Sequence, residues 1–217
     1  MKKLTLALFL AIFLLSACAN VPDTTQANTP IVMVSVQPQA YFVQKIAGDL
    51  VEVQAMVGTG DDPHTYEPTT EQMRSLTNAQ LYFSIGVEFE AAWLPRFTAA
   101  NPNLKIVDSA EGVVRLPAAP NTSGEEAGEP DPHIWLSPSR VKQISANMAA
   151  ALAELDPSNA TIYEQNLAQW LQEIDQVDAD IRLALSGISR NVFLSVHPSW
   201  GYFADEYGLQ MLAVEQE

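Results

Sequence analysis

The sequence GDDPHTYEPT occupies residues 60–69 and carries His64, one of three histidines in a chain of 217 residues. The other two, His133 and His197, lie in the distant segments DPHIWLSP and VHPSWGYFADEYGL. Each of the three is next to a proline, which restricts the backbone that carries the imidazole. Imidazole nitrogen is a preferred zinc ligand, so three stiffly held rings from separate segments indicate a metal site assembled by the fold.

On both sides of this stretch, strand patterns alternate with helix patterns. Residues 31–36 (IVMVSV) form a continuous apolar run, which is typical of a strand buried on both faces. Alternating apolar residues at 51–57 predict a second strand, and Thr69 or Thr70 can cap a short helix that follows. Further strands are predicted at residues 81–85, 104–107, 192–196 and 210–214. The alternation predicts an α/β fold with a mostly parallel sheet, in which ligands bind beyond the carboxyl ends of the strands.

The second half of the chain is expected to be largely helical. Ser137 and Pro138 suit the N-cap and first position of a helix. After Asp156, apolar residues recur in steps of three and four over nearly thirty residues, which predicts one long helix lying across two lobes. The stripe comprises Tyr163, Leu167, Trp170, Ile174, Val177 and Ile181. Residues 109–130, rich in Pro, Gly, Ala and Glu, are predicted to form an exposed acidic loop.

The N-terminus has the pattern of a targeting segment. Lys2 and Lys3 precede an apolar run at residues 4–15, which is too short to span a bilayer comfortably, so residues 1–17 are predicted to be a signal peptide. The LSAC sequence that ends at Cys18 resembles a bacterial lipobox, in which this cysteine is lipidated; the alternative is an ordinary signal peptide with a chance cysteine. Residues 18–30 then form a polar, flexible tether. Cys18 is the only cysteine, which excludes disulfides and thiolate metal ligands from the folded part.

Composition narrows the function classes further. About half of the residues are hydrophobic (47%), as expected for a globular protein. The formal net charge of −15 argues against nucleic acid as a partner, because neutralising phosphates requires Lys and Arg. An acidic surface attracts cations weakly, although simple solubility accounts for most of these carboxylates.

The three histidine segments resemble the metal-site segments of the extracytoplasmic metal-binding proteins of zinc and manganese ABC transporters, the cluster 9 or cluster A-I solute-binding family. The resemblance runs over residues 31–214. It implies two Rossmann-like α/β lobes joined by one rigid helix, here an N-terminal lobe at residues 31–156, a linking helix at 157–187 and a partial C-terminal lobe at 188–217. It further implies a monomer that is anchored to the membrane by its lipid, on the outer side, and that delivers its metal to a permease driven by an ATPase.

Carried over by position, the resemblance makes His64 and His133 ligands from the first lobe and His197 a ligand from the second. A histidine at the third position goes mainly with Zn²⁺ in this family and a glutamate with Mn²⁺, which agrees with the preference of manganese for oxygen ligands. The family's fourth ligand is a late aspartate, expected beyond residue 217. We therefore expect a C-terminally incomplete second lobe and leave the fourth ligand unassigned. The acidic loop also lacks the histidines that many zinc members carry there.

Two alternatives come from other function classes. Three histidines and a water also describe catalytic zinc, but a hydrolase needs a general base, the chain has no HExxH motif, and only Glu67 lies nearby. The second alternative is a surface adhesin, as lipoproteins of this family have been called. Nothing in the sequence encodes a partner surface for that role. A binding protein without enzymatic activity is the better interpretation.

Overall fold

A parallel sheet of four strands forms the centre of the computed structural model, which describes residues 29–63, 65–118 and 130–214. The strands lie in the order β2-β1-β3-β4, and each neighbouring pair is parallel. Their bounds are β1 (Ile31–Val36), β2 (Glu52–Val57), β3 (Leu81–Ser84) and β4 (Lys105–Asp108). Residues 32–36 of the central strand β1 are all buried, which confirms that this apolar run is covered on both faces.

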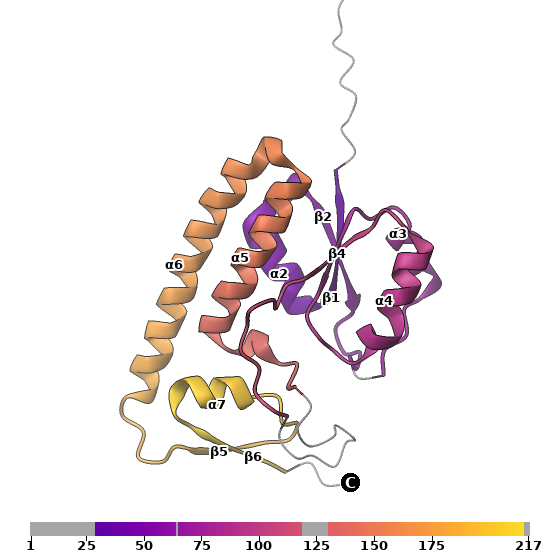
Figure 1. Cartoon of the computed structure of the whole chain (residues 1–217). Coiled ribbons are helices and arrows are strands. Elements are labelled where there is room, and N and C mark those ends of the chain that lie inside the picture. The colour runs from indigo at the N-terminus through magenta and orange to yellow at the C-terminus, as the bar shows by residue number, and fades with distance from the viewer. Residues whose placement is uncertain (1–28, 64, 119–129, 215–217) are drawn as a thin grey trace, which may run out of the picture.

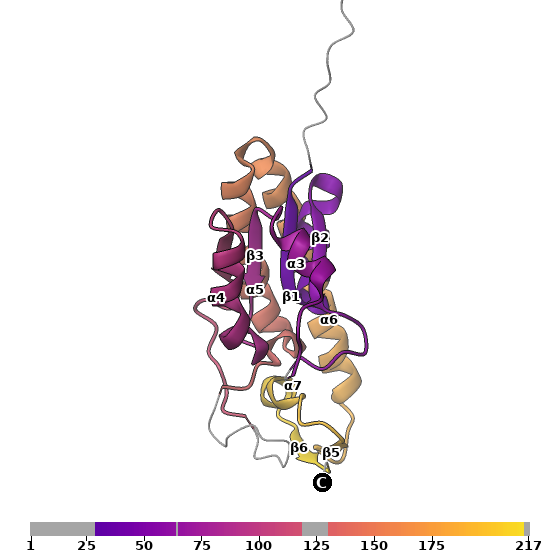
Figure 2. The ribbon, with the colours of Figure 1, turned by 90° about the vertical axis from the view of Figure 1, so that its right-hand side faces the viewer.

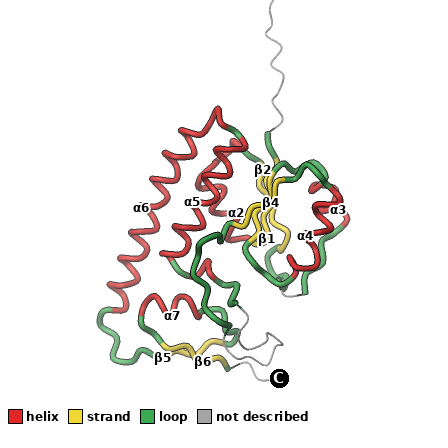
Figure 3. Tube along the Cα trace, in the orientation of Figure 1, coloured by secondary structure: helices red, strands yellow, loops and turns green. Residues whose placement is uncertain are grey.

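Helices cover both faces of this sheet, as Figures 1 and 3 show. On one side lie α2 (Gln37–Ala47), α5 (Pro138–Leu155) and α6 (Ala160–Leu185), which pack against one another. On the other side lie α3 (Thr70–Leu76) and α4 (Phe89–Ala100). The predicted caps are confirmed: Thr69 accepts a hydrogen bond from the Gln72 amide, and Ser137 accepts one from the Arg140 amide. The α/β fold class is therefore confirmed.

A second, smaller unit follows α6. Strands β5 (Val192–Ser195) and β6 (Gln210–Ala213) pair in parallel, and α7 (Gly201–Tyr207) connects them. Figures 1 and 2 both place α7 and this strand pair beyond the carboxyl ends of the four-stranded sheet. The sequence-predicted strands at 192–196 and 210–214 therefore exist, and they lie where a parallel sheet places its ligands.

The long helix differs from its prediction in two respects. Residues Pro157–Asn159 form a separate 3₁₀ turn, so α6 begins at Ala160 and ends at Leu185. The Asp156 carboxylate accepts hydrogen bonds from the side chains of Ser158 and Asn159 within this turn. The apolar stripe is buried at Tyr163, Trp170 and Ile174, where α2 and α5 cover it, whereas Val177 is 50% exposed. Helical periodicity locates the stripe, but the length of the neighbouring helices decides how much of it is covered.

The predicted exposed loop at residues 109–130 begins inside the core. Ser109 is fully buried; its hydroxyl donates a hydrogen bond to the carbonyl oxygen of Ser84 at 2.7 Å. Its hydroxyl oxygen also accepts one from the Gln39 amide at 3.0 Å. The prediction of an exposed loop is therefore wrong at this end, because a small polar side chain found two buried partners. Residues 119–129, which carry the loop's acidic cluster, lie outside the described residues.

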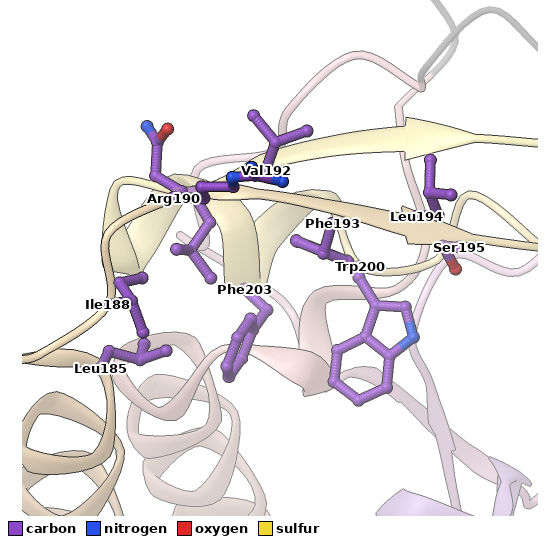
Figure 4. Close-up of a pocket in the computed structure, with 11 residues that line it drawn as sticks. Leu185, Ile188, Arg190, Val192, Phe193, Leu194, Ser195, Trp200 and Phe203 are labelled. Atoms are coloured by element: carbon purple, nitrogen blue, oxygen red, sulfur yellow. The ribbon is translucent and has the colours of Figure 1, made fainter.

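An apolar cavity of about 410 Å³ lies between the end of α6, strand β5 and α7. Figure 4 shows Leu185, Ile188, Trp200 and Phe203 among the side chains that line it. Neither His133 nor His197 contributes to its walls, so this cavity is separate from the histidine site described below.

A buried carboxyl group lies where β3 ends and α4 begins. Glu90 is 5% exposed and accepts hydrogen bonds from the amides of Ile85 and Gly86, both at 2.9 Å, and from the Ser35 hydroxyl at 2.5 Å. Burial raises the pKa of the Glu90 carboxyl, and these three hydrogen bonds oppose only part of the rise. The folded protein therefore binds this proton more tightly than the unfolded chain does.

That difference predicts a pH effect on stability. The contribution of Glu90 to folding should become more favourable as the pH falls from 7 towards the unfolded value of about 4.3, because protonation removes the penalty for a buried charge. Urea unfolding of the wild type and of Glu90→Gln at pH 7 and pH 5 measures it. The unfolding free energy of the wild type relative to the variant should be higher at pH 5. An unchanged or smaller difference would contradict the argument, and Glu164→Gln, on the exposed face of α6, is the control.

Candidate metal centre

His133 is held in place by the segment that leads into α5. His133 is 6% exposed, and a 3₁₀ turn (Ile134–Leu136) begins directly after it. The amide of Ile134 donates to the carbonyl of Pro132 at 2.8 Å, and the amide of Leu136 donates to the carbonyl of His133 at 3.1 Å. The ring of Trp135 meets the imidazole edge to face, with 5.3 Å between centroids. Backbone turns and an aromatic neighbour therefore restrict the orientation of this ring.

Asp131 sets the protonation pattern of the His133 ring. Its Oδ1 atom lies 2.8 Å from the His133 amide nitrogen and 2.8 Å from the ring atom Nδ1. An ionised carboxylate only accepts hydrogen bonds, so the proton of the neutral ring sits on Nδ1. Nε2 then carries a lone pair, which is the form of imidazole that binds a metal ion.

His197 approaches this nitrogen from the second unit of the structure. It lies between β5 and α7, and its carbonyl oxygen accepts a hydrogen bond from the Ser195 hydroxyl at 2.6 Å. Its Nε2 atom is 3.3 Å from Nε2 of His133, and the two rings are inclined at 73° with 5.1 Å between centroids. Two histidines that are 64 residues apart in sequence thus point the same ring atom at one place.

This separation suits two ligands of one metal ion. Zinc–nitrogen bonds of about 2.0–2.1 Å in a tetrahedral site require ligand nitrogens roughly 3.3 Å apart. The observed distance between the two Nε2 atoms is 3.3 Å. The Asp131 carboxylate lies immediately behind the His133 ring, with its Oδ1 atom 2.8 Å from Nδ1.

Two residues singled out in the sequence, His64 and Cys18, lie outside the described residues. Described residues on either side of His64 make hydrogen bonds of their own. Before it, Asp61 accepts a hydrogen bond from the Gly58 amide at 3.2 Å; after it, the Tyr66 hydroxyl donates to Gln72 at 2.7 Å. Tyr66 also packs edge to face on Phe89, with 5.6 Å between ring centroids. Glu67, the general base considered for a hydrolase, is exposed.

Sequence reasoning missed the role of Asp131. The proline in each Asp-Pro-His segment indicates rigidity, but the aspartate that opens the second segment is also the hydrogen-bond partner of the imidazole. A signal was present, because an aspartate two residues before a histidine can accept from both its amide and its ring.

Among residues 29–63, 65–118 and 130–214, no group of three or more His, Cys, Asp or Glu side chains is arranged to hold a metal ion.

A parallel α/β sheet with a second unit beyond the carboxyl ends of its strands has the architecture of a ligand-binding α/β protein. The chain belongs to the family described as zinc-uptake complex component A, periplasmic (ZnuA), whose model matches residues 32–217. In the part of the chain that is described, no helix is long and apolar enough to cross a membrane.

Solved structures and curated relatives agree with this assignment. A crystal structure of a ZnuA deletion mutant with zinc bound matches with a TM-score of 0.80 and 42% identity, over 88% of this chain and 71% of that one. The manganese ABC transporter substrate-binding lipoprotein PsaA of Streptococcus anginosus is 31% identical, over 96% of this chain and 70% of its own length. The zinc-binding lipoprotein AdcA of Streptococcus pneumoniae (strain ATCC BAA-255 / R6) is 27% identical over 99% of this chain, which spans only 44% of AdcA.

Proposed function

We propose that this protein binds Zn²⁺ outside the cytoplasmic membrane and delivers it to an ABC permease and its ATPase for uptake. The metal ion is the cargo, and the protein performs no covalent chemistry on it. The observation that carries the proposal is the 3.3 Å approach of the Nε2 atoms of His133 and His197, which come from separate units of the fold. Membership of the ZnuA family supports the same role.

The proposed ligands are His64, His133 and His197, with the fourth position unassigned. Three imidazoles favour zinc over manganese, because manganese prefers oxygen donors and forms weaker complexes with a given nitrogen site. The zinc-bound ZnuA structure and the name of AdcA are consistent with zinc. The name of PsaA supports the alternative, manganese or another divalent ion.

The proposed location follows from the relatives and from the sequence. The curated relatives AdcA and PsaA are named as lipoproteins, and LSAC at residues 15–18 supplies a candidate lipidation site at Cys18 in this chain. We propose that this chain, too, is anchored by a lipid on the extracytoplasmic side of a bacterial membrane and acts there as a monomer. The test is metabolic labelling with [³H]palmitate. The wild-type chain should incorporate the label, and Cys18→Ser should not.

The metal assignment predicts two results. The metal-free protein should bind one equivalent of Zn²⁺ in competition with a chromophoric chelator, and excess Mn²⁺ should not displace it. Most nitrogen sites bind Zn²⁺ more tightly than Mn²⁺, so binding alone does not identify the transported ion, and a growth assay is needed. Deletion of the gene should slow growth in zinc-depleted medium, and added zinc should restore it. A growth defect that manganese alone relieves would favour the manganese alternative. Absence of any zinc binding would refute the proposed function.

A further inference from the structure

The phenol group of Tyr202 contacts the backbone of Asp131, the residue whose side chain bonds the His133 ring. Tyr202 belongs to α7 and is fully buried. Its hydroxyl donates a hydrogen bond to the carbonyl oxygen of Asp131 at 2.7 Å and accepts one from the amide of Leu116 at 3.0 Å. The Asp131 amide in turn donates to the carbonyl oxygen of Leu116 at 2.8 Å. The Tyr202 hydroxyl therefore joins the segment of Leu116 to the segment of Asp131, the residue that orients His133.

The backbone of the same helix also passes close to the Asp131 side chain. A Cβ atom built on Gly201 would lie 2.9 Å from Oδ2 of Asp131, which is closer than real Cβ contacts allow. The backbone of α7 therefore limits where the Asp131 carboxylate can sit. Asp131 is restrained at its carbonyl oxygen by Tyr202 and at its carboxylate by Gly201, two consecutive residues of one helix.

Charged contacts hold α7 against the start of α5. Glu206 accepts hydrogen bonds from the Ser137 hydroxyl and, at 3.1 Å, from the Ser139 amide. Arg140 bonds Asp205 at 3.0 Å, and its guanidinium lies 4.6 Å from the centre of the Tyr202 ring. Burial raises the pKa of the Tyr202 phenol, so the hydroxyl keeps its proton and remains a donor at neutral pH.

We infer that Tyr202 and Gly201 are positioning residues: they hold Asp131 so that it fixes His133 with Nε2 directed at His197. The inference rests on the proposed function, in which His133 and His197 are metal ligands that this arrangement preorganises. Because α7 also follows His197 by four residues, one helix sets both the orientation of His133 and the approach of His197. Outer-shell partners of metal-binding histidines typically change metal affinity by about 10–100-fold.

The test compares matched pairs of variants in the full chain. Tyr202→Phe keeps the ring and removes the hydroxyl; its control is Tyr207→Phe, on the same helix, whose hydroxyl bonds Asp178 at 2.9 Å instead. Gly201→Ala introduces the close contact with Asp131; its control is Gly187→Ala, where an added Cβ meets nothing within 4 Å. Each protein is measured by zinc competition against a chromophoric chelator and by ¹H–¹⁵N spectra of the histidine rings without metal.

Both test variants should lower zinc affinity by about tenfold or more, while both controls stay within about twofold of the wild type. In the metal-free spectra, both should also shift the His133 ring nitrogens away from the pattern of a proton on Nδ1, which a mere loss of stability would not do. The inference is overturned if Tyr202→Phe and Gly201→Ala leave the His133 ring signals at the wild-type positions. If the wild type itself fails to bind zinc, the proposed function fails, and the ring spectra still decide whether α7 positions His133.

Discussion

Replacing His133 with alanine should lower zinc affinity by more than the roughly 10–100-fold that is typical for outer-shell changes. The reason is that the substitution removes a proposed ligand atom itself, leaving Nε2 of His197 without the nitrogen that lies 3.3 Å away. It also leaves the buried carboxylate of Asp131 without the ring that it binds. Competition of the metal-free variant against a chromophoric chelator, at constant pH and ionic strength, measures the loss.

A neighbouring aromatic residue provides the control for this prediction. Trp135→Phe changes the ring that packs against His133 while keeping all three histidines, and should reduce zinc affinity by less than about tenfold. Urea unfolding of both metal-free variants shows whether each is folded under the binding conditions. A folded His133→Ala protein with zinc affinity within tenfold of the wild type would show that His133 does not hold the metal.

The largest expected effect on stability is at Gln39, in the first turn of α2. Its side chain is fully buried, and Oε1 accepts hydrogen bonds from the amides of Ser35 at 3.0 Å and Val36 at 3.1 Å. Its Nε2 donates to the carbonyls of Phe83 and Ser84, both at 3.2 Å. Gln39→Ala should lower the free energy of unfolding by about 3 kcal/mol, because each buried group left without a partner costs about 1–3 kcal/mol.

The same helix carries a glutamine in a contrasting environment. Gln44 is exposed, so Gln44→Ala should change the unfolding free energy by no more than about 0.5 kcal/mol. Urea unfolding of the two variants and the wild type, analysed as a two-state transition, gives both values. A loss below about 1 kcal/mol for Gln39→Ala would mean that water or a relaxed backbone satisfies these groups.

Much of the fold is predictable because its signals are local. The apolar run at residues 31–36 predicts a buried strand, and Thr69 and Ser137 predict helix starts, since each feature depends on residues within one or two turns. The boundary of the long helix is not predicted correctly, because the Asp156 side chain closes a 3₁₀ turn before Ala160. Proline at position 157 is compatible with either start, so sequence alone does not separate the two.

The candidate site divides in the same way. The sequence by itself determines which side chains are candidates for the site, since the chain has three histidines, one cysteine and a proline beside each imidazole. Only the tertiary structure decides that His133 and His197 meet at 3.3 Å, and that Asp131 and Tyr202 stand behind them. The hydrogen bonds from Tyr202 to Asp131 and from Ser139 to Glu206 join residues 71 and 67 positions apart, and no local pattern carries that information. The sequence supplies the types of side chain, whereas packing between distant segments brings those side chains together.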